Sequence, residues 1–353
     1  MRYFLFILAV AAGLSIGTTS TRAQEQETVI GGKKLKQWIA EIGHSDPGVR
    51  ENAIRTVMLF GKEARQAGKA LINELNDNDP SLRVNAAIAL SVIGLDVEDV
   101  DRGVKALGRL LTNDSQAIVR LQAAVALGAY GRDARAAVPQ LAAAVRDLYT
   151  SWEVRRTAAT ALRTVAMDRK EGKDGPDPRA IRALMGALTD VATKVRMEAL
   201  MSLVMLGPPV DDNLRASEKV ALEKLFRHHD KIQAIWALVA FMRIDDKVSE
   251  KHLTTIGQLL KSSELLVRTN AGEALGIMGP AAKSQIPALI SALNDKEPLM
   301  VATAAGALGN MGETAQQAVP ALKPLAESKD ESLRAVVKEA IEKITNPKKP
   351  AVR

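Results

Sequence analysis

A pattern of 23 residues that recurs along the chain constrains the fold more than any other feature. It is clearest at Val119–Leu141 (VRLQAAVALGAYGRDARAAVPQL) and returns at Val267–Leu289 (VRTNAGEALGIMGPAAKSQIPAL). After the opening Val-Arg pair, small or apolar residues stand 4, 7, 8 and 11 positions later, and a Gly stands at position 12. These offsets lie on one face of an α-helix. The Gly ends the helix because glycine tolerates the left-handed conformation of a cap.

The pattern occurs nine times, so it is a structural unit. The opening pairs are Val49-Arg50, Leu82-Arg83, Val119-Arg120, Val154-Arg155, Val195-Arg196, Asp230-Lys231, Val267-Arg268, Met300-Val301 and Leu333-Arg334. Successive pairs lie 33 to 41 residues apart, and a period in that range is typical of solenoids built from helix pairs. The sixth unit is degenerate, because charged residues replace its opening pair.

A second helix with its own signature follows the glycine. Val138-Pro139, Ile286-Pro287 and Val319-Pro320 share this signature, and proline is tolerated in the first helical turn because its missing N–H has no partner there. Several loops end in an acidic residue and a proline, which together cap the next helix: Asp46-Pro47, Asp79-Pro80 and Glu297-Pro298. A single helix around Trp38 precedes the first unit, so the array begins with half a unit.

The composition agrees with close helix packing and excludes several kinds of site. Apolar residues make up 47% of the chain but aromatic residues only 3%, which suits helices better than a β-sandwich. The chain has no cysteine, so disulfides, thiol nucleophiles and cysteine-based metal sites are excluded. The net charge is +7, but five of the positive charges lie near the chain ends, which weakens a nucleic-acid interpretation.

The two ends differ from the array. Residues 1–23 have a basic start, an apolar run over Tyr3–Ile16 and a small-x-small site at Thr21-Arg22-Ala23. These features predict a secretory signal peptide and a periplasmic or secreted protein; an uncleaved N-terminal anchor is the alternative. The run is shorter than the roughly 20 residues that span a bilayer, so we expect no membrane span in the mature chain. We expect a linker at 24–33, the solenoid at 34–345 and a disordered basic tail at 346–353.

On these residues the chain resembles HEAT-repeat proteins, in particular the subtype named after phycobilisome lyases, over residues 34–345. The resemblance implies a right-handed α-solenoid of about nine helix pairs, similar to armadillo and HEAT superhelices. It places the first helix of each unit on the convex side and the second on the concave side. It also implies that Asp and Arg residues hydrogen-bond between neighbouring units. The matching positions are Asp46, Asp79, Arg50, Arg83, Arg120, Arg155, Arg196, Arg268 and Arg334.

An enzyme is the main alternative within this resemblance. Deoxyhypusine hydroxylase has a similar architecture and holds iron with His-Glu pairs, but none of His44, His228, His229 and His252 precedes a Glu. Bilin lyases have similar repeats, but export argues against their function. The chain also lacks the nucleotide-binding, serine-hydrolase and zinc-protease motifs. We therefore predict no catalytic residues, no metal and no cofactor, and we expect no nucleic-acid partner.

The remaining signals lie where the units differ. A basic set is expected to line the middle of the concave face and to attract an acidic protein segment: Arg102, Lys105, Arg109, Arg146, Arg179 and Arg182. Tyr149 and Trp152 stand in a loop beside two arginines, a composition typical of binding hot spots. An insertion at 168–178 lengthens the fourth unit. Ordinary solvation of the charges, packing of Trp152 between units and a tolerated insertion are the competing explanations.

These observations together favour a non-catalytic protein-interaction scaffold that presents a concave helical surface to a protein partner. The identity of that partner is not encoded in any motif of the chain. The enzyme alternative is a HEAT-like oxidoreductase or lyase, and nucleic-acid binding is a third alternative that export disfavours.

Overall fold

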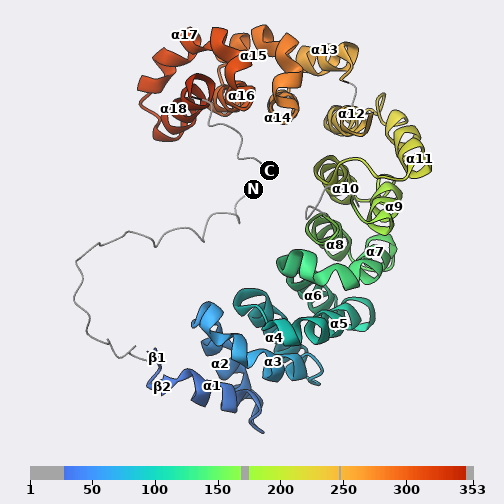
Figure 1. The fold of residues 1–353 in the computed structure, drawn as a ribbon, viewed down its shortest axis with the longest axis vertical. Helices are drawn as coiled ribbons and strands as arrows, with labels where there is room; N and C mark the ends of the chain where they lie inside the picture. Colours follow the sequence, from blue (N-terminus) through green and yellow to red (C-terminus); the bar gives the residue numbers. More distant parts are fainter. Residues whose placement is uncertain (1–27, 168–174, 246–247, 347–353) are drawn as a thin grey trace.

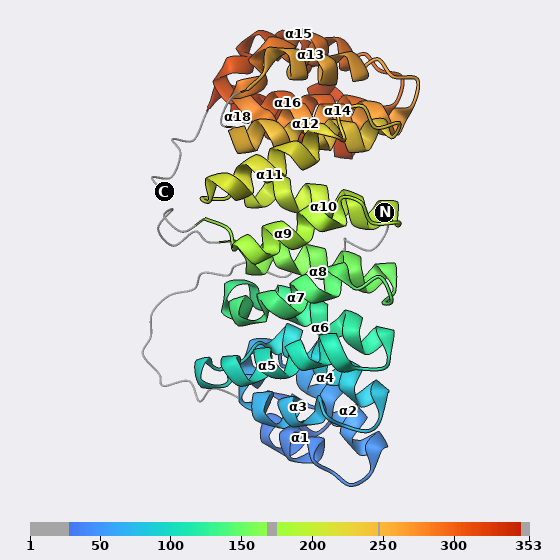
Figure 2. The ribbon, with the colours of Figure 1, turned by 90° about the vertical axis from the view of Figure 1, so that its right-hand side faces the viewer.

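An open arc of stacked helices makes up the protein. The computed structural model describes residues 28–167, 175–245 and 248–346, and over these ranges the helices follow one another along the arc in sequence order (Figure 1, Figure 2). The predicted all-α solenoid is therefore confirmed. The predicted signal at 1–23, residues 168–174 of the insertion and the tail from residue 347 lie outside the described residues. No helix in the described ranges has the length and hydrophobicity that a membrane crossing requires.

Two layers of helices build the arc. The inner layer holds the helices that carry the repeated opening pair (Figure 1). They are α2 (Pro47–Met58), α4 (Pro80–Ile93), α6 (Ala117–Tyr130), α8 (Trp152–Val165), α10 (Thr193–Leu206), α12 (Lys231–Asp245), α14 (Leu265–Met278), α16 (Pro298–Asn310) and α18 (Glu331–Thr345). The outer layer holds α1 (Leu35–Ile42), α3 (Gly68–Glu74), α5 (Val97–Asn113), α7 (Val138–Arg146), α9 (Pro178–Ala187), α11 (Asp212–Glu223), α13 (Glu250–Leu259), α15 (Ile286–Ala292) and α17 (Val319–Leu322).

Short 3-10 helices join the layers in several units. They are η1 (Gly61–Ala67), η2 (Gly131–Ala137), η3 (Gly279–Gln285), η4 (Gly312–Ala318) and η5 (Lys323–Glu327). Gly131 ends α6 as expected and has a φ of 54° and a ψ of −127°, a positive-φ conformation that favours glycine but differs from the expected left-handed helical cap. Pro139 lies in the first turn of α7 as expected.

The order of the layers is the reverse of the expected one, because the helices with the Val-Arg pair lie inside the arc and not on its convex side. Helices on the inner side of a curved array must lie closer together than those on the outer side, and small residues allow this close approach. A Cβ atom on Gly276 would lie 3.1 Å from the Cα atom of Ala307, and one on Gly309 would lie 2.8 Å from the Cα atom of Ala340. Helix backbones of α14, α16 and α18 therefore touch almost directly along the inner layer.

A small hairpin closes the N-terminal end of the array, where a linker was predicted at 24–33. The strands β1 (Val29–Ile30) and β2 (Lys33–Lys34) pair antiparallel. The indole Nε1 of Trp38 donates to the carbonyl of Ile30 at 2.9 Å, and the ammonium of Lys33 lies 4.5 Å from the ring centroid of Trp38. The hairpin overlaps the end of the predicted linker and packs on Trp38 of α1.

An arginine ladder ties several of the units to the next one. The guanidinium of Arg83 donates two hydrogen bonds, of 2.7 and 3.0 Å, to the carboxylate of Asp114 in the following loop. Its third nitrogen donates to the carbonyl of Asp77 at 2.8 Å. Arg155 repeats the arrangement with Asp190 at 2.7 and 2.9 Å. One side chain therefore fastens its own loop and the loop of the next unit.

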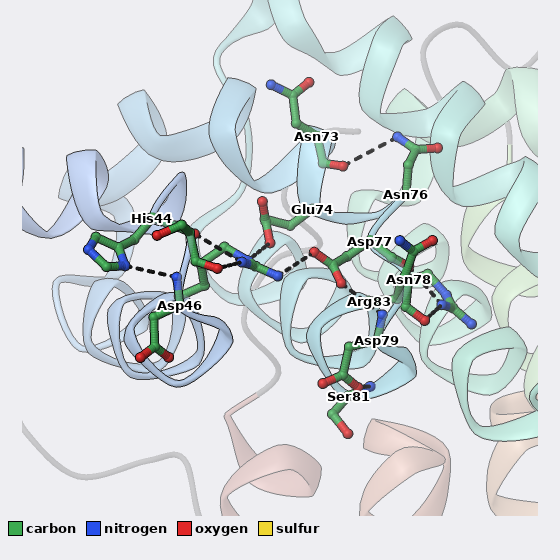
Figure 3. A network of polar contacts seen from close by, with 12 residues as sticks. His44, Asp46, Asn73, Glu74, Asn76, Asp77, Asn78, Asp79, Ser81 and Arg83 are labelled. Carbon is green, nitrogen blue, oxygen red and sulfur yellow. Dashed lines mark hydrogen bonds and ion pairs between the residues drawn. The ribbon is translucent and has the colours of Figure 1, made fainter.

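The aspartates of this ladder differ from the ones expected. Asp77, Asp114, Asp190 and Asp295 accept from the arginines, and each also accepts from a backbone N–H two residues later. Asp46 and Asp79 instead cap their own helices, by accepting from the amides of Gly48 and Ser81. Figure 3 shows Asp77 and Asp79 in these two roles at the first rung. The inter-unit role is confirmed for Arg50, Arg83, Arg120, Arg155 and Arg268. It is not found for Arg196 and Arg334, whose bonds stay within their own loop and helix, nor for Asp46 and Asp79.

The rung at Asp190 is the most deeply buried of these pairs, since the side chains of Arg155 and Asp190 are 5% and 2% exposed. Burial opposes ionisation of Asp190, but hydrogen bonds from Arg155 and from the amide of Ala192 outweigh it, so the pKa of the carboxyl is lowered. Asp190 is therefore ionised throughout the physiological pH range.

The ladder lapses around the sixth unit. Arg196 donates to the carbonyl of Asp190 and to the hydroxyl of Thr193, but its Nε is buried with no partner. The position equivalent to Asp190 in the next unit is Leu225, which explains the missing acceptor. The junction between α10 and α12 therefore lacks the arginine–aspartate pair of a regular rung.

Asp190→Ala should lower the free energy of unfolding by about 3 kcal/mol, because it leaves the buried guanidinium of Arg155 uncompensated. Asp79→Ala, which removes only a helix cap, should cost about 1 kcal/mol. Urea unfolding followed by circular dichroism measures both. Equal losses for the two variants would contradict the ladder.

Leu127→Ala should cost roughly 2–5 kcal/mol, because Leu127 is fully buried and its removal leaves a cavity. Val125→Ala on the same helix is the matched control, since Val125 is 41% exposed, and it should change stability by less than about 0.5 kcal/mol. The same unfolding assay compares them, and a cost near zero for Leu127→Ala would refute its assigned inward direction.

Candidate functional site

The predicted basic set lies on the outer layer. Arg102, Lys105 and Arg109 belong to α5, Arg146 ends α7, and Arg179 and Arg182 belong to α9, and these three helices lie on the convex side of the arc (Figure 1). The expected concave position of these residues is therefore wrong. The error follows from the reversed layers, because the helix that carries the Val-Arg pair occupies the inner radius.

Some members of the basic set already have protein partners. Arg102 donates to the side-chain oxygen of Asn73 at 2.7 Å, and Arg146 donates to the carbonyl of Ala142 in its own helix. Arg179 forms an ion pair with Asp177 at 2.7 Å. The set is an exposed strip on the outer helices, and its role in partner binding stays a prediction.

The two aromatic residues of the predicted hot spot lie in different surroundings. Tyr149 is completely exposed. Trp152 starts α8, packs partly against the core, and has the ammonium of Lys194 at 4.3 Å from its ring centroid. Trp152 is the member of the predicted set that lies beside the inner layer, next to the groove described below.

A groove runs along the inner layer from α8 to α16. Two neighbouring cavities form it, and they share Met201 of α10. Every residue that lines either cavity belongs to an inner-layer helix: Arg156, Thr193, Lys194, Met197, Glu198, Met201, Trp236, Glu273, Gly276, Ile277, Ala302, Thr303, Gly306, Ala307 and Asn310. Because no outer helix contributes, the groove opens on the concave side of the arc (Figure 1). We call it the inner groove.

The first cavity of the inner groove, between α8 and α10, has a volume of about 320 Å³. Its charged groups already pair with one another, since Glu198 lies 3.6 Å from Arg156 and 3.4 Å from Arg163. Lys194 lies over Trp152. The methionines Met197 and Met201 supply the apolar part of the lining.

The second cavity, between α10, α12, α14 and α16, has a volume of about 420 Å³. Met201, Trp236 and Ile277 contribute large apolar side chains, and the rest of the lining is mostly glycine and alanine. Glu273 is the one charged residue among the lining residues. Partial burial raises the pKa of the Glu273 carboxyl, although the residue keeps exposed surface at the mouth.

A larger cavity of about 510 Å³ lies elsewhere, at the loop edge beside Arg268 and Asp295. These two residues bind each other at 2.8 Å as a rung of the ladder. The cavity is therefore a gap between repeat loops whose main charged groups stabilise the array, and the inner groove is the better candidate for a binding site.

The helices α11 and α12, where the fifth unit meets the sixth, contain buried polar groups without partners. Glu218 of α11 is fully buried, neither of its carboxyl oxygens has a hydrogen-bond partner, and burial raises its pKa to about 8. Gln233 of α12 is also fully buried, and its amide is unpaired. Buried polar groups without hydrogen bonds destabilise a fold, and buried charges do so more strongly, so this junction is a weak part of the array.

The histidines do not form a metal site in the described ranges, where no group of three or more histidine and carboxylate side chains is placed to hold an ion. His228 and His229 stack with ring centroids 4.2 Å apart, and His228 accepts from the amide of Asp230 at 3.1 Å. His252 lies against the rings of Phe226 and Phe241. His44, His228 and His229 therefore lie in loops between helices, and His252 packs against aromatic rings.

Comparison with protein families identifies the repeat. The family model for HEAT repeats matches residues 34–128, 104–204 and 281–342. The matched segments leave out residues 205–280, which hold the degenerate sixth unit. No curated protein matches the sequence.

Solved structures resemble this chain at low sequence identity. A chain in the structure of Kap95p with RanGDP is 12% identical with a TM-score of 0.58, and the match covers 90% of this chain and 46% of that one. An engineered protein is 21% identical with a TM-score of 0.47, covering 88% of both chains. A computationally designed armadillo repeat protein for modular peptide recognition is 20% identical with a TM-score of 0.46, covering 60% of this chain and all of that one.

The buried Glu218 predicts a pH-dependent stability. Its pKa in the folded state, about 8, exceeds the ordinary value of 4.5, so the folded chain holds a proton that the unfolded chain has lost between these values. Stability should therefore fall as pH rises from 5 to 8, by about 1.4 kcal/mol per pH unit from this group.

Glu218→Gln should remove this slope and unfold at higher urea concentration than the wild type at pH 7.5. The matched control is Glu223→Gln, an exposed carboxylate on the same helix, which should leave the slope unchanged. Parallel stability–pH curves for the wild type and Glu218→Gln would contradict the assignment.

Proposed function

We propose that this chain, which belongs to the HEAT-repeat family, is a non-catalytic scaffold that binds an extended segment of a partner protein in the inner groove. The observation that carries the proposal is the pair of adjoining cavities that share Met201 and are lined only by inner-layer helices. Sites on the concave side of a solenoid offer a long surface to a long ligand.

The inner layer also carries side chains, beyond those that line the groove, that suit a polypeptide ligand. Val92 of α4, Val125 of α6 and Met205 of α10 are 41–49% exposed. Asn52, Asn85 and Gln122 stand at the same position of the first three units, on α2, α4 and α6. A side-chain amide offers both a donor and an acceptor, which matches the backbone groups of an extended chain, and the amide of Asn85 also donates to Glu51.

The likeness to Kap95p supports this proposal. Kap95p, whose fold this chain shares, binds RanGDP, so a solenoid of this shape serves as a protein-binding surface in at least one relative. The methionine-rich lining of the first cavity is adaptable, because methionine is flexible and polarisable.

Two finer assignments belong to the same proposal. The Val-Arg and Ala-Val-Pro signatures support the subtype named after phycobilisome lyases, and the apolar run at residues 3–16 supports export to the periplasm or secretion. N-terminal sequencing of the protein recovered from the native host tests export. A chain that begins near Gln24 supports it, and an intact Met1 in the soluble cell extract contradicts it.

Met201→Glu should weaken binding of the partner about tenfold or more, because it places an unpaired charge where both cavities meet. The partner is first identified by affinity capture and mass spectrometry, and its affinity is then measured by calorimetry with purified proteins. The melting temperature of the variant checks that the array is intact.

The control is the triple variant Arg102→Glu, Lys105→Glu and Arg109→Glu on the outer strip. It should leave the affinity unchanged. If the triple variant lost binding and Met201→Glu did not, the partner would bind the outer helices. That result would contradict the inner-groove proposal and support the predicted acidic partner.

A further inference from the structure

We infer that the second cavity of the inner groove receives a lysine or arginine side chain of the bound segment, with Glu273 as its counter-charge. The inference rests on the proposed function and adds a specificity to it. It follows from the shape of the cavity, from the bonding of its polar groups and from the charges around it.

The cavity exists because small residues form one side of it. Its lining includes Gly276, Ala302, Gly306 and Ala307. A Cβ atom on Gly306 would meet no atom within 4 Å, so the space above α16 is open. A volume of about 420 Å³ lies within the range of about 300–1,000 Å³ typical of ligand pockets, and it admits a long unbranched side chain.

Most of the polar groups at the cavity are already engaged. The indole Nε1 of Trp236 donates to the side-chain oxygen of Asn270 at 2.8 Å. The hydroxyl of Thr303 donates to the carbonyl of Leu299 at 2.8 Å. Within the described residues, Glu273 has no hydrogen bond or ion pair. Its carboxylate is therefore the free, acceptor-only group at this point of the groove.

The lining of the second cavity contains no counter-charge for Glu273. The equivalent positions of the two neighbouring units are Trp236 and Gly306, and the other lining residues are neutral. At the first cavity, Arg156 is paired with Glu198, which also binds Arg163, and Lys194 lies over the ring of Trp152. A cation brought by a ligand would thus meet an uncompensated carboxylate, whereas an anionic side chain would be repelled.

The apolar part of the lining selects among cations. Met201, Trp236 and Ile277 would contact the methylene stem of a lysine or arginine while its charged end reaches Glu273, because these side chains bury their stems along apolar surface. A hydrated metal ion lacks such a stem, and a single carboxylate is too few ligands for one. A ligand that combines an apolar methylene stem with a positive charge is a lysine or arginine side chain.

Selection from a library of random peptides displayed on phage tests the inference without knowledge of the natural partner. The purified wild type should enrich peptides with lysine or arginine at one aligned position beside apolar residues. Glu273→Gln should lose that preference, and Glu273→Lys should replace it with aspartate or glutamate. Glu313→Gln, an exposed carboxylate in η4, is the control and should select as the wild type does.

A synthetic peptide of the selected consensus then gives the size of the effect. Replacing its basic residue with alanine, or changing the protein by Glu273→Gln, should weaken binding about tenfold, and the two changes together should cost little more than one. Gly306→Leu should also weaken binding by filling the cavity. Its melting temperature should not fall, since the added side chain enters open space.

The outcomes separate this inference from the proposed function. Enriched peptides with no basic preference, or a preference that survives Glu273→Gln, would overturn the inference and leave the groove as a binding site. Failure to enrich any peptide on the wild type would overturn both the extended-segment function and the inference.

Discussion

The arginine ladder is the interaction on which the arrangement of the units depends. In a regular rung, one guanidinium donates to backbone carbonyls of its own loop and to the carboxylate of the next loop, and it thereby holds the two loops together. The regular rungs are those of Arg83, Arg155 and Arg268. The planar, five-donor group suits this double role better than an ammonium. Lysine replaces the ladder arginine at Lys231, whose contact to Glu264 is exposed, and valine replaces it at Val301, so the ladder is interrupted at the sixth and eighth units.

The inner groove lies close to the sixth unit. Elsewhere in the inner layer, glycine and alanine bring the helices into contact, as Gly309 and Ala340 do. The sixth unit instead carries the large side chain of Trp236 on its inner helix. Met201 and Glu273 stand at the equivalent positions of the units on either side, and these three residues all line the second cavity between α10 and α16.

Features within each unit could be predicted from the sequence, but the arrangement of the helices relative to one another could not. The offsets within each unit predicted that Leu127 is buried, that Gly131 ends a helix and that Pro139 begins the next. A helical period identifies the buried face of one helix, but it does not predict which of the two helix layers lies on the concave side. That is why Arg102 and its neighbours were expected on the concave side.

The same limit explains the residues that were missed. Met201, Trp236 and Glu273 stand at one equivalent position in three successive units, and nothing in a single unit sets them apart. A signal was present in their variety, because the packed positions of the units repeat whereas this position differs from unit to unit. The degenerate sixth unit was recognised as irregular, but the second cavity beside it depends on packing across four helices.

The central claim is that partners bind on the inner layer, and hydrogen–deuterium exchange with and without the bound partner tests it most directly. The account predicts new protection of backbone amides at the exposed ends of α10, α14 and α16 and no change in α5, α7 and α9. Protection confined to α5, α7 and α9, with the inner helices unaffected, would contradict it.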